Sequence, residues 1–265
     1  MGEHSTGQVA ASAAEIYEQF FVPALFAAWP EHVLRAAEVE VGQTVLDVAC
    51  GTGILSREAR KLVGGSGTVV GVDINEGMLA VARSKSPDIE WRQGQAESLP
   101  FEDAVFDHVV SQFGLMFFQD RSKAISEMLR VLRPGRSGCV AVWASLSETP
   151  GYAEVAQMLA DIFDPDVAKS VEAPYCLGDT NELESIFAMA GARSISIRTI
   201  SGKARFESID SWLYTDIKGW TLAEAIDDHD YERLRKAAPP YLEKFAREDG
   251  KIEFEAPANL VTFST

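Results

Sequence analysis

The chain has 265 residues, 46% of them hydrophobic, and a formal net charge of −16 at pH 7. This length and apolar content predict a single large domain over residues 1–265. The acidic balance, with lysines and arginines scattered rather than grouped, opposes binding to a phosphate backbone, so we expect no nucleic-acid partner.

The cysteines and the apolar segments indicate the compartment. Cys50, Cys139 and Cys176 form no C-x-x-C pair, and any disulfide scheme leaves one of them unpaired. The first residues lack the basic and apolar regions of a signal peptide, and no apolar run approaches the length of about 20 residues that spans a membrane. The sequence therefore predicts a cytoplasmic protein, a monomer or homodimer, with no membrane partner and no metal site.

The N-terminal part carries a helical pattern. Residues 10–28 have the spacing of an amphipathic helix with Ile16 and Phe20 on one face, and Pro23 predicts an interruption. We assign this segment to an N-terminal helical cap over residues 1–40.

The stretch from Thr44 to Arg60 predicts a buried strand, a glycine turn and a helix. Its first residues are β-branched or aliphatic, Gly51 and Gly53 form the turn, and charged residues mark the outer face of the helix. This unit opens a doubly wound α/β sheet, which binds its ligand outside the carboxyl ends of the strands. Small residues in the turn let the backbone approach that ligand closely.

A dinucleotide-binding fold is the competing interpretation of this turn. Its fingerprint is G-x-G-x-x-G, but Ser56 stands at the place of the third glycine. Asp47, just before the turn, can accept hydrogen bonds from an ammonium group and would repel a pyrophosphate. A NAD(P)-dependent enzyme is therefore disfavoured.

Further strands follow at regular spacing. Residues 68–73 form the second, ending in Asp73 at about the distance from the glycine turn where acids that bind ribose hydroxyls fall. The third and fourth strands are predicted over residues 89–93 and 105–111. A helix over residues 121–132 is stopped by Pro134 and Gly135, and a fifth strand covers residues 138–143.

Four motifs in the correct order between residues 40 and 145 carry a family resemblance. LDVACGTG resembles motif I of the class I S-adenosylmethionine (SAM)-dependent methyltransferases, and GVDINEGMLAVAR resembles their motif II. GQAESLPF and the later LRPGR resemble segments of the small-molecule enzymes of ubiquinone and menaquinone biosynthesis. Gln95 departs from the aspartate usual in the third motif; its amide carbonyl can still accept a hydrogen bond from an adenine amino group, without charge assistance.

The resemblance implies a fold and a cofactor. The fold is a seven-stranded, doubly wound, Rossmann-like sheet, mostly parallel with an antiparallel last strand, plus a helical lid. The cofactor is S-adenosylmethionine, and Tyr17 belongs to a Y-E-x-F segment that resembles the part closing over it in related enzymes. The expected cofactor-binding residues are Tyr17, Asp47, Ala49, Cys50, Gly51, Asp73, Ile74, Met78, Gln95, Ala96 and Ser111.

Residues 41–147 are expected to form the SAM-binding core, and residues 148–265 the rest of the sheet with helical insertions that make a substrate lid. The patterns there predict helices over 151–163 and 179–190, a strand over 194–200, a mainly helical region over 207–249 and a last strand over 253–263.

The expected activity is methyl transfer to a small-molecule acceptor at oxygen, nitrogen or carbon. In-line displacement at a sulfonium mainly requires that acceptor and methyl group be held in near-attack geometry, and a base is needed only when the acceptor must lose a proton. Weak catalytic candidates are Tyr17, His32, Tyr214, Asp216 and His229. Candidates for acceptor binding are Phe20, Phe113, Met116 and Trp212. A SAM-binding module without catalysis is the remaining alternative.

Overall fold

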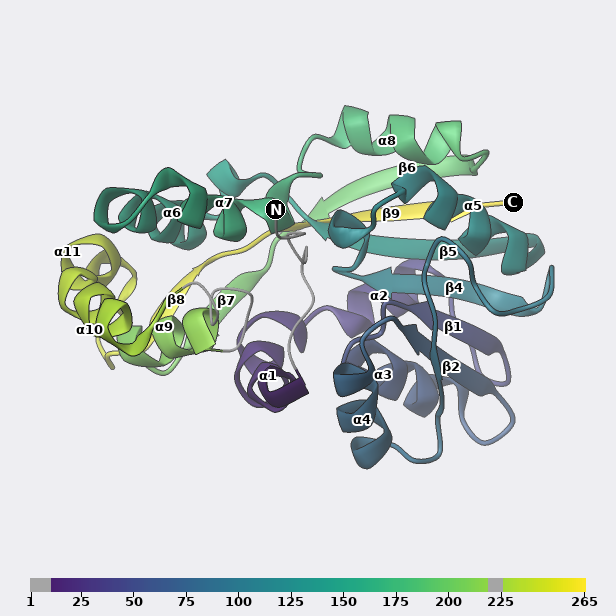
Figure 1. Ribbon diagram of the computed structural model, residues 1–265. Helices are drawn as coiled ribbons and strands as arrows, with labels where there is room; N and C mark the ends of the chain where they lie inside the picture. The colour runs from purple at the N-terminus through teal and green to yellow at the C-terminus, as the bar shows by residue number, and fades with distance from the viewer. Residues whose placement is uncertain (1–10, 219–225) are drawn as a thin grey trace, which may run out of the picture.

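The computed structural model describes residues 11–218 and 226–265. Its centre is a seven-stranded sheet with helices on both faces (Figure 1). Strand β9 runs antiparallel to both of its neighbours, and the other pairings are parallel. The doubly wound fold with an antiparallel last strand is therefore confirmed. The strands across the sheet are β3 (Glu90–Gln93), β2 (Thr68–Asp73), β1 (Thr44–Val48), β4 (Phe106–Gln112), β5 (Leu132–Trp143), β9 (Ala258–Ser264) and β6 (Arg193–Ile200).

The central strands are apolar on both faces because helices cover both faces. Val45, Leu46 and Val48 of β1 are each fully buried, as expected for parallel strands inside an α/β sheet. The elements that pack around this sheet are α1 (Ala11–Ile16), the π-helix η1 (Tyr17–Phe26), α2 (Pro30–Ala36), α3 (Ile54–Val63), α4 (Glu76–Lys85), the 3₁₀ turn η2 (Leu115–Phe117), α5 (Arg121–Val131) and α8 (Thr180–Met189).

A second group of elements lies beside the sheet, on the left in Figure 1, and we call it the accessory lobe. Trp212 is its fully buried centre and stacks on Phe206, with Phe254 and Tyr152 against its other sides. Its strands β7 and β8 form a separate antiparallel pair. The lobe contains α6 (Pro150–Ile162), α7 (Pro165–Glu172), β7 (Lys203–Phe206), α9 (Ile209–Lys218), α10 (Asp228–Ala237), α11 (Pro239–Leu242) and β8 (Ile252–Glu255).

The prediction of one strand over 253–263 was wrong. Pro257 separates β8 from β9, which belong to different sheets. Proline cannot donate to a strand ladder, and here its carbonyl accepts a hydrogen bond from the Ala144 backbone N–H at 3.0 Å. The partner strand β7 was not predicted, and residues 219–225 of the predicted helical region lie outside the described residues.

The predicted break at Pro23 was also wrong. The helix continues through this residue as the ten-residue π-helix η1, in which the Ala27 N–H donates to the carbonyl of Val22 five residues earlier at 2.8 Å. Phe21, Val22 and Leu25 are buried, so tertiary packing stabilises a geometry that is rare on its own. The N-terminal part of the predicted cap, residues 1–10, lies outside the described residues.

The fifth strand begins earlier than predicted. Helix α5 ends at Val131 and β5 starts at Leu132, two residues before Pro134. The register with β4 jumps between Phe106 and His108, so Pro134 falls in an irregular segment where its missing N–H costs no ladder bond.

Close packing between β4, β5 and β9 provides a test of the fold. A Cβ atom added at Gly138 would lie 2.7 Å from the backbone oxygen of Val109 and closer still to the Phe263 ring. The backbone oxygen belongs to the ladder and cannot move aside. We expect Gly138→Ala to lower the free energy of unfolding by about 2–3 kcal/mol, measured by urea denaturation.

Gly65→Ala is the matched control. A Cβ atom at Gly65 would meet nothing within 4 Å, so its effect should stay within about 0.5 kcal/mol. Equal stability of the two variants would contradict the packing argument.

Candidate active site

A cavity of about 450 Å³ opens at the carboxyl ends of β1, β2 and β4. This is the position at which doubly wound sheets bind ligands, and the size suits a small molecule or cofactor. The lining residues are Tyr17, Phe26, Asp47, Ala49, Cys50, Gly51, Thr52, Ile54, Leu55, Val72, Asp73, Ile74, Asn75, Met78, Gly94, Gln95, Ala96, Glu97, Gln112, Phe113, Gly114, Phe117, Phe118, Gln119, Asp120, Lys123 and Trp143.

The glycine turn forms the floor of this cavity. Ala49, Gly51 and Gly53 all have positive φ, at 57°, 55° and 87°. A Cβ atom at Gly51 would meet nothing within 4 Å, so the backbone there is open to the cavity, whereas one at Gly53 would overlap the Trp91 ring. The turn thus exposes bare backbone at the start of α3, where unpaired N–H groups point outward.

Asp73 ends β2 at the side of this turn. Its carboxylate accepts hydrogen bonds from the backbone N–H groups of Gly51 and Asn75, both at 2.8 Å. Burial nevertheless raises its pKa above the usual value for aspartate. The side chain is 9% exposed, so the turn and the end of β2 are fixed together while the carboxylate borders the cavity.

Asp47 of β1 is almost fully buried below the turn. Its Oδ2 accepts a hydrogen bond from the Ser56 hydroxyl at 2.6 Å, and burial raises its pKa to about 7. Its Oδ1 has no hydrogen-bond partner among the described residues. A buried carboxylate oxygen left unpaired beside a cavity is costly unless a ligand supplies a donor, and the ammonium group of the amino-acid part of SAM supplies one. The unpaired acceptor oxygen of Asp47 therefore fits this cofactor.

The side of the cavity beyond Asp73 is flat and apolar. Ile74, 43% exposed, and Met78 line it. Gln95 and Ala96 face the cavity from the turn after β3, where the Ser98 N–H donates to the Gln95 carbonyl at 3.1 Å. An apolar surface bordered by an amide and by backbone groups suits a ring with polar groups at its edge.

The opposite side of the cavity is aromatic. Tyr17 stacks on Phe26 with ring centroids 5.3 Å apart, and Phe113 stacks on Trp143 at 3.8 Å. Phe113 has a φ of 58°, a left-handed conformation that bulky residues rarely adopt. Burial and the nearby carboxylates of Asp73 and Glu18 raise the pKa of Tyr17, so its hydroxyl stays neutral.

Some predicted binding residues lie outside this lining. Ser111 is fully buried, and its hydroxyl lies 3.2 Å from where a Cβ atom at Gly114 would be. Met116 is buried in the core, Phe20 packs edge-on against Tyr214, and Trp212 is the centre of the accessory lobe. The structure brings together all the other predicted cofactor residues and, of the acceptor candidates, Phe113.

Of the catalytic candidates, only Tyr17 lines the cavity. His32 is exposed beside Trp29, and Tyr214 is 39% exposed. Asp216 is buried in the accessory lobe, where it accepts a hydrogen bond from the Tyr152 hydroxyl at 3.0 Å and where burial raises its pKa to about 7.

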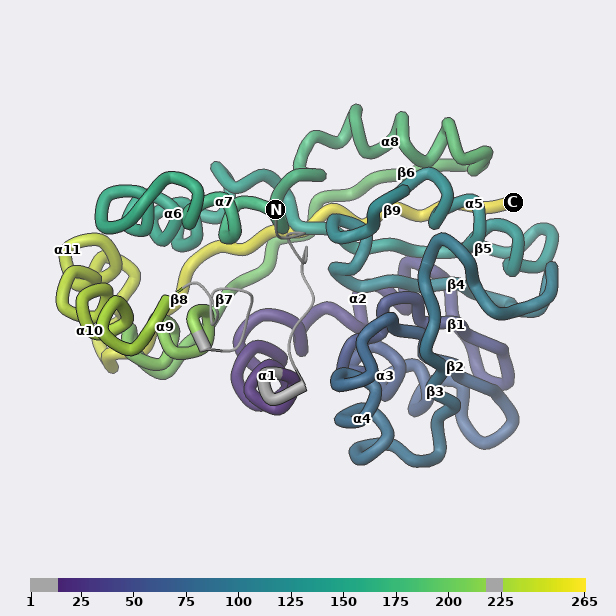
Figure 2. The backbone as a smooth tube through the Cα atoms, in the orientation of Figure 1, coloured from purple at the N-terminus to yellow at the C-terminus, as the bar shows by residue number. Residues whose placement is uncertain are grey.

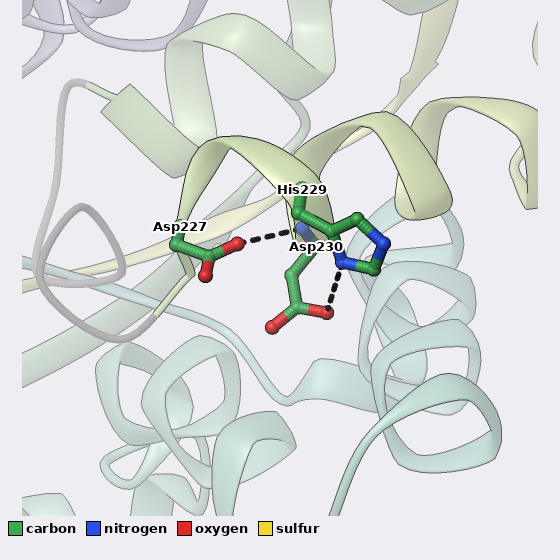
Figure 3. A group of neighbouring side chains, drawn as sticks. All are labelled: Asp227, His229 and Asp230. Atoms are coloured by element: carbon green, nitrogen blue, oxygen red, sulfur yellow. Dashed lines mark hydrogen bonds and ion pairs between the residues drawn. The ribbon is translucent and has the colours of Figure 1, made fainter.

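His229 lies with Asp227 and Asp230 at the start of α10 (Figure 3). The three side chains bring potential ligand atoms close together, but Asp227 accepts a hydrogen bond from the Asp230 N–H at 2.8 Å as the N-cap of this helix. The cap explains the position of the acid, and none of the three residues lines the cavity.

Several lining residues were not predicted from the sequence. Trp143 ends β5 and Gln112 ends β4, so both follow the rule that strand ends face the site. That signal was available for both. Glu97 follows the predicted Gln95 and Ala96 in the same motif, whereas Lys123 had no comparable signal, because the first turn of α5 reaches the cavity only through tertiary packing.

The buried acid predicts a pH-dependent stability. In the ligand-free folded protein the pKa of Asp47 is about 7 instead of 3.8, so the folded state holds a proton that the unfolded chain loses. The free energy of unfolding therefore falls as pH rises from about 4 to about 7. Asp47→Asn should remove about 2–4 kcal/mol of this fall, measured by denaturation at pH 4.5 and pH 8. The same pH dependence in both proteins would contradict the shifted pKa.

Comparisons with known proteins show the family of this chain. A family model described as a methyltransferase domain matches residues 45–135. Demethylmenaquinone methyltransferase of Staphylococcus carnosus is 34% identical over 188 residues, which cover 66% of this chain and 78% of that protein. The ubiquinone/menaquinone biosynthesis C-methyltransferase UbiE of Escherichia coli is 44% identical over 113 residues, 40% of this chain and 45% of that protein.

Solved structures show the same fold. A phosphoethanolamine N-methyltransferase 2 of Haemonchus contortus in complex with S-adenosyl-L-methionine has a TM-score of 0.62 at 18% identity, covering 97% of this chain and 57% of that one. Among the described residues, no helix is both long and apolar enough to cross a membrane. With its relatives, its fold and its four motifs, this chain belongs to the class I SAM-dependent methyltransferases and is an enzyme that methylates a small-molecule acceptor.

Proposed function

We propose that this methyltransferase transfers a methyl group to a ring carbon of a reduced quinone. The aromatic side of the cavity carries this proposal, because Tyr17, Phe26, Phe113 and Trp143 make a wall suited to a flat, apolar ring. Relatives named for demethylmenaquinone methylation and for ubiquinone/menaquinone C-methylation support the same acceptor class.

We further propose how the chain holds its cofactor. When bound, S-adenosylmethionine supplies an electrophilic methyl group on a positively charged sulfur. Asp73 accepts hydrogen bonds from the ribose hydroxyls, and the unpaired oxygen of Asp47 accepts one from the ammonium group. Ile74 and Met78 contact the adenine ring, and the carbonyl of Gln95 accepts from its amino group.

The residues of the aromatic wall orient the acceptor. Their ring faces exclude water and stabilise positive charge near the sulfur. Bound S-adenosylmethionine would supply the methyl group, and the acceptor ring carbon that takes it would release its proton to solvent, so that the ring stays aromatic. Holding the ring carbon in line with the breaking bond is the main contribution the chain makes.

Direct assay tests the acceptor. Reduced demethylmenaquinone with a shortened tail should yield a carbon-methylated product and an equal amount of S-adenosylhomocysteine, identified by mass spectrometry and by NMR of the product. Methylation of phosphoethanolamine or of a catechol oxygen, with the reduced quinone unreacted, would overturn the proposal.

Asp73 provides the test of the cofactor site. Asp73→Ala removes the acceptor of the ribose hydroxyls and the bond from Gly51, so binding of S-adenosylhomocysteine should weaken by about 1.5–3 kcal/mol in calorimetry. Asp73→Asn keeps one acceptor oxygen and should lose less. The exposed Glu102→Ala is the control, and an unchanged affinity in Asp73→Ala would remove Asp73 from the site.

Phe117, a further aromatic residue of the cavity lining, provides the test of acceptor binding. It lines the cavity and is only partly buried, so Phe117→Ala should raise the acceptor KM about tenfold, equivalent to about 1.4 kcal/mol, and change the cofactor Kd less than twofold. Trp212→Phe alters an aromatic cluster outside the cavity, so it should lower the melting temperature without changing KM. Equal KM values in Phe117→Ala and the wild type would contradict this assignment.

A further inference from the structure

Glu18 is a largely buried acid at the start of the π-helix η1, with a side chain that is 10% exposed. It makes three polar contacts with residues of the glycine turn, α3 and α4. The Thr52 hydroxyl donates to its Oε2 at 2.5 Å, the Arg57 guanidinium donates to its Oε1 at 2.9 Å, and the Lys85 ammonium lies 3.4 Å from Oε1.

These partners come from the elements that build the cofactor side of the cavity. Thr52 is part of the glycine turn, Arg57 lies in the second turn of α3, and Lys85 ends α4. The Arg57 guanidinium also donates to the carbonyl of Thr52 at 2.6 Å. Glu18, Thr52 and Arg57 therefore form a closed ring of hydrogen bonds around one edge of the turn.

The π-helix that carries Glu18 contributes two residues to the aromatic wall of the cavity. Tyr17 precedes it and lines the cavity together with Phe26 at the other end of the same π-helix. The π-helix also packs against β7 and α9 of the accessory lobe, while α1 packs against α4 of the sheet domain. The N-terminal helix thus bridges the two parts of the molecule, and it runs between them in Figure 2.

The contacts of Glu18 fix the position of the helix more than they add to the free energy of unfolding. A buried ion pair gains attraction and loses hydration in similar amounts, so its net contribution to folding is small. Its direction is specific, however, because the Arg57 fork and the Thr52 hydroxyl each bind a different oxygen of the carboxylate. The buried side chains of Phe21 and Leu25 attach the same helix by apolar packing, which fixes its direction less closely than these hydrogen bonds do.

We propose that Glu18 is a positioning residue that fastens the N-terminal helix to the glycine turn and so holds Tyr17 and Phe26 over the bound cofactor. Through this link one side chain fixes the position of the aromatic wall relative to the glycine turn. Loss of the carboxylate lets the helix open and the cofactor leave faster.

The experiment compares Glu18→Gln with Glu15→Gln, an exposed acid one turn earlier on the same segment. In the ligand-free protein, amide hydrogen exchange over residues 14–26 should be at least tenfold faster in Glu18→Gln than in the control. The Kd for S-adenosylhomocysteine should rise about 5–20-fold, mainly through faster dissociation in stopped-flow fluorescence. Unchanged exchange and unchanged Kd in Glu18→Gln would overturn the proposal.

Arg57→Lys covers the case in which Glu18→Gln does not fold. It keeps the charge but replaces the guanidinium fork with a single ammonium, so exchange over residues 14–26 should rise to an intermediate level. Wild-type exchange in this variant, with a folded protein, would equally overturn the role of the ring.

The proposal rests on the proposed cofactor site, and the measurements separate the two. The exchange experiment uses the ligand-free protein and does not depend on which residues bind the cofactor. If Asp73→Ala binds S-adenosylhomocysteine normally, the cofactor site is wrong. If Asp73→Ala weakens binding while Glu18→Gln leaves both exchange and Kd unchanged, only the role of Glu18 is wrong.

Discussion

The structure depends on two carboxylates that are kept at the ends of neighbouring parallel strands. Asp47 and Asp73 approach one turn from β1 and β2, and Asp73 accepts the N–H of Gly51 within that turn. Burial raises both pKa values, so keeping these two carboxylates charged is unfavourable without a partner. A cationic ligand with several hydrogen-bond donors would relieve this cost, which suits a positively charged cofactor.

The part of the site that could be predicted is the part encoded in local sequence. The strand, glycine turn and helix around Gly51 need particular residue types at fixed spacing, and the sheet order follows from repeated units of this kind. Trp143 could have been included, since it ends a strand of the same sheet.

The rest of the structure could not be predicted from local sequence patterns, because it depends on contacts between distant residues. Residues 253–263 resemble one strand interrupted by Pro257, and the pairing of β8 with β7 shows that they divide between two sheets. The π-helix passes through Pro23 because buried neighbours on both parts of the molecule hold it there. Trp212 looked like a residue of a binding wall, but it is the core of a lobe whose partners are scattered over more than a hundred residues.

The indole of Trp91 restricts which residues can stand at positions 53 and 71. Its ring fills the space beside both Gly53 and Gly71, where an added Cβ atom at Gly71 would lie 2.5 Å from it, and its N–H donates to the Ser86 carbonyl at 2.9 Å, which holds the ring in place. While the tryptophan remains, neither glycine can acquire a side chain without displacing the ring. A smaller residue at position 91 would first leave a void beneath the turn. A substitution at any one of these three positions therefore destabilises the protein until the others change too. We expect the three residues to change more slowly in evolution than residues elsewhere in the chain.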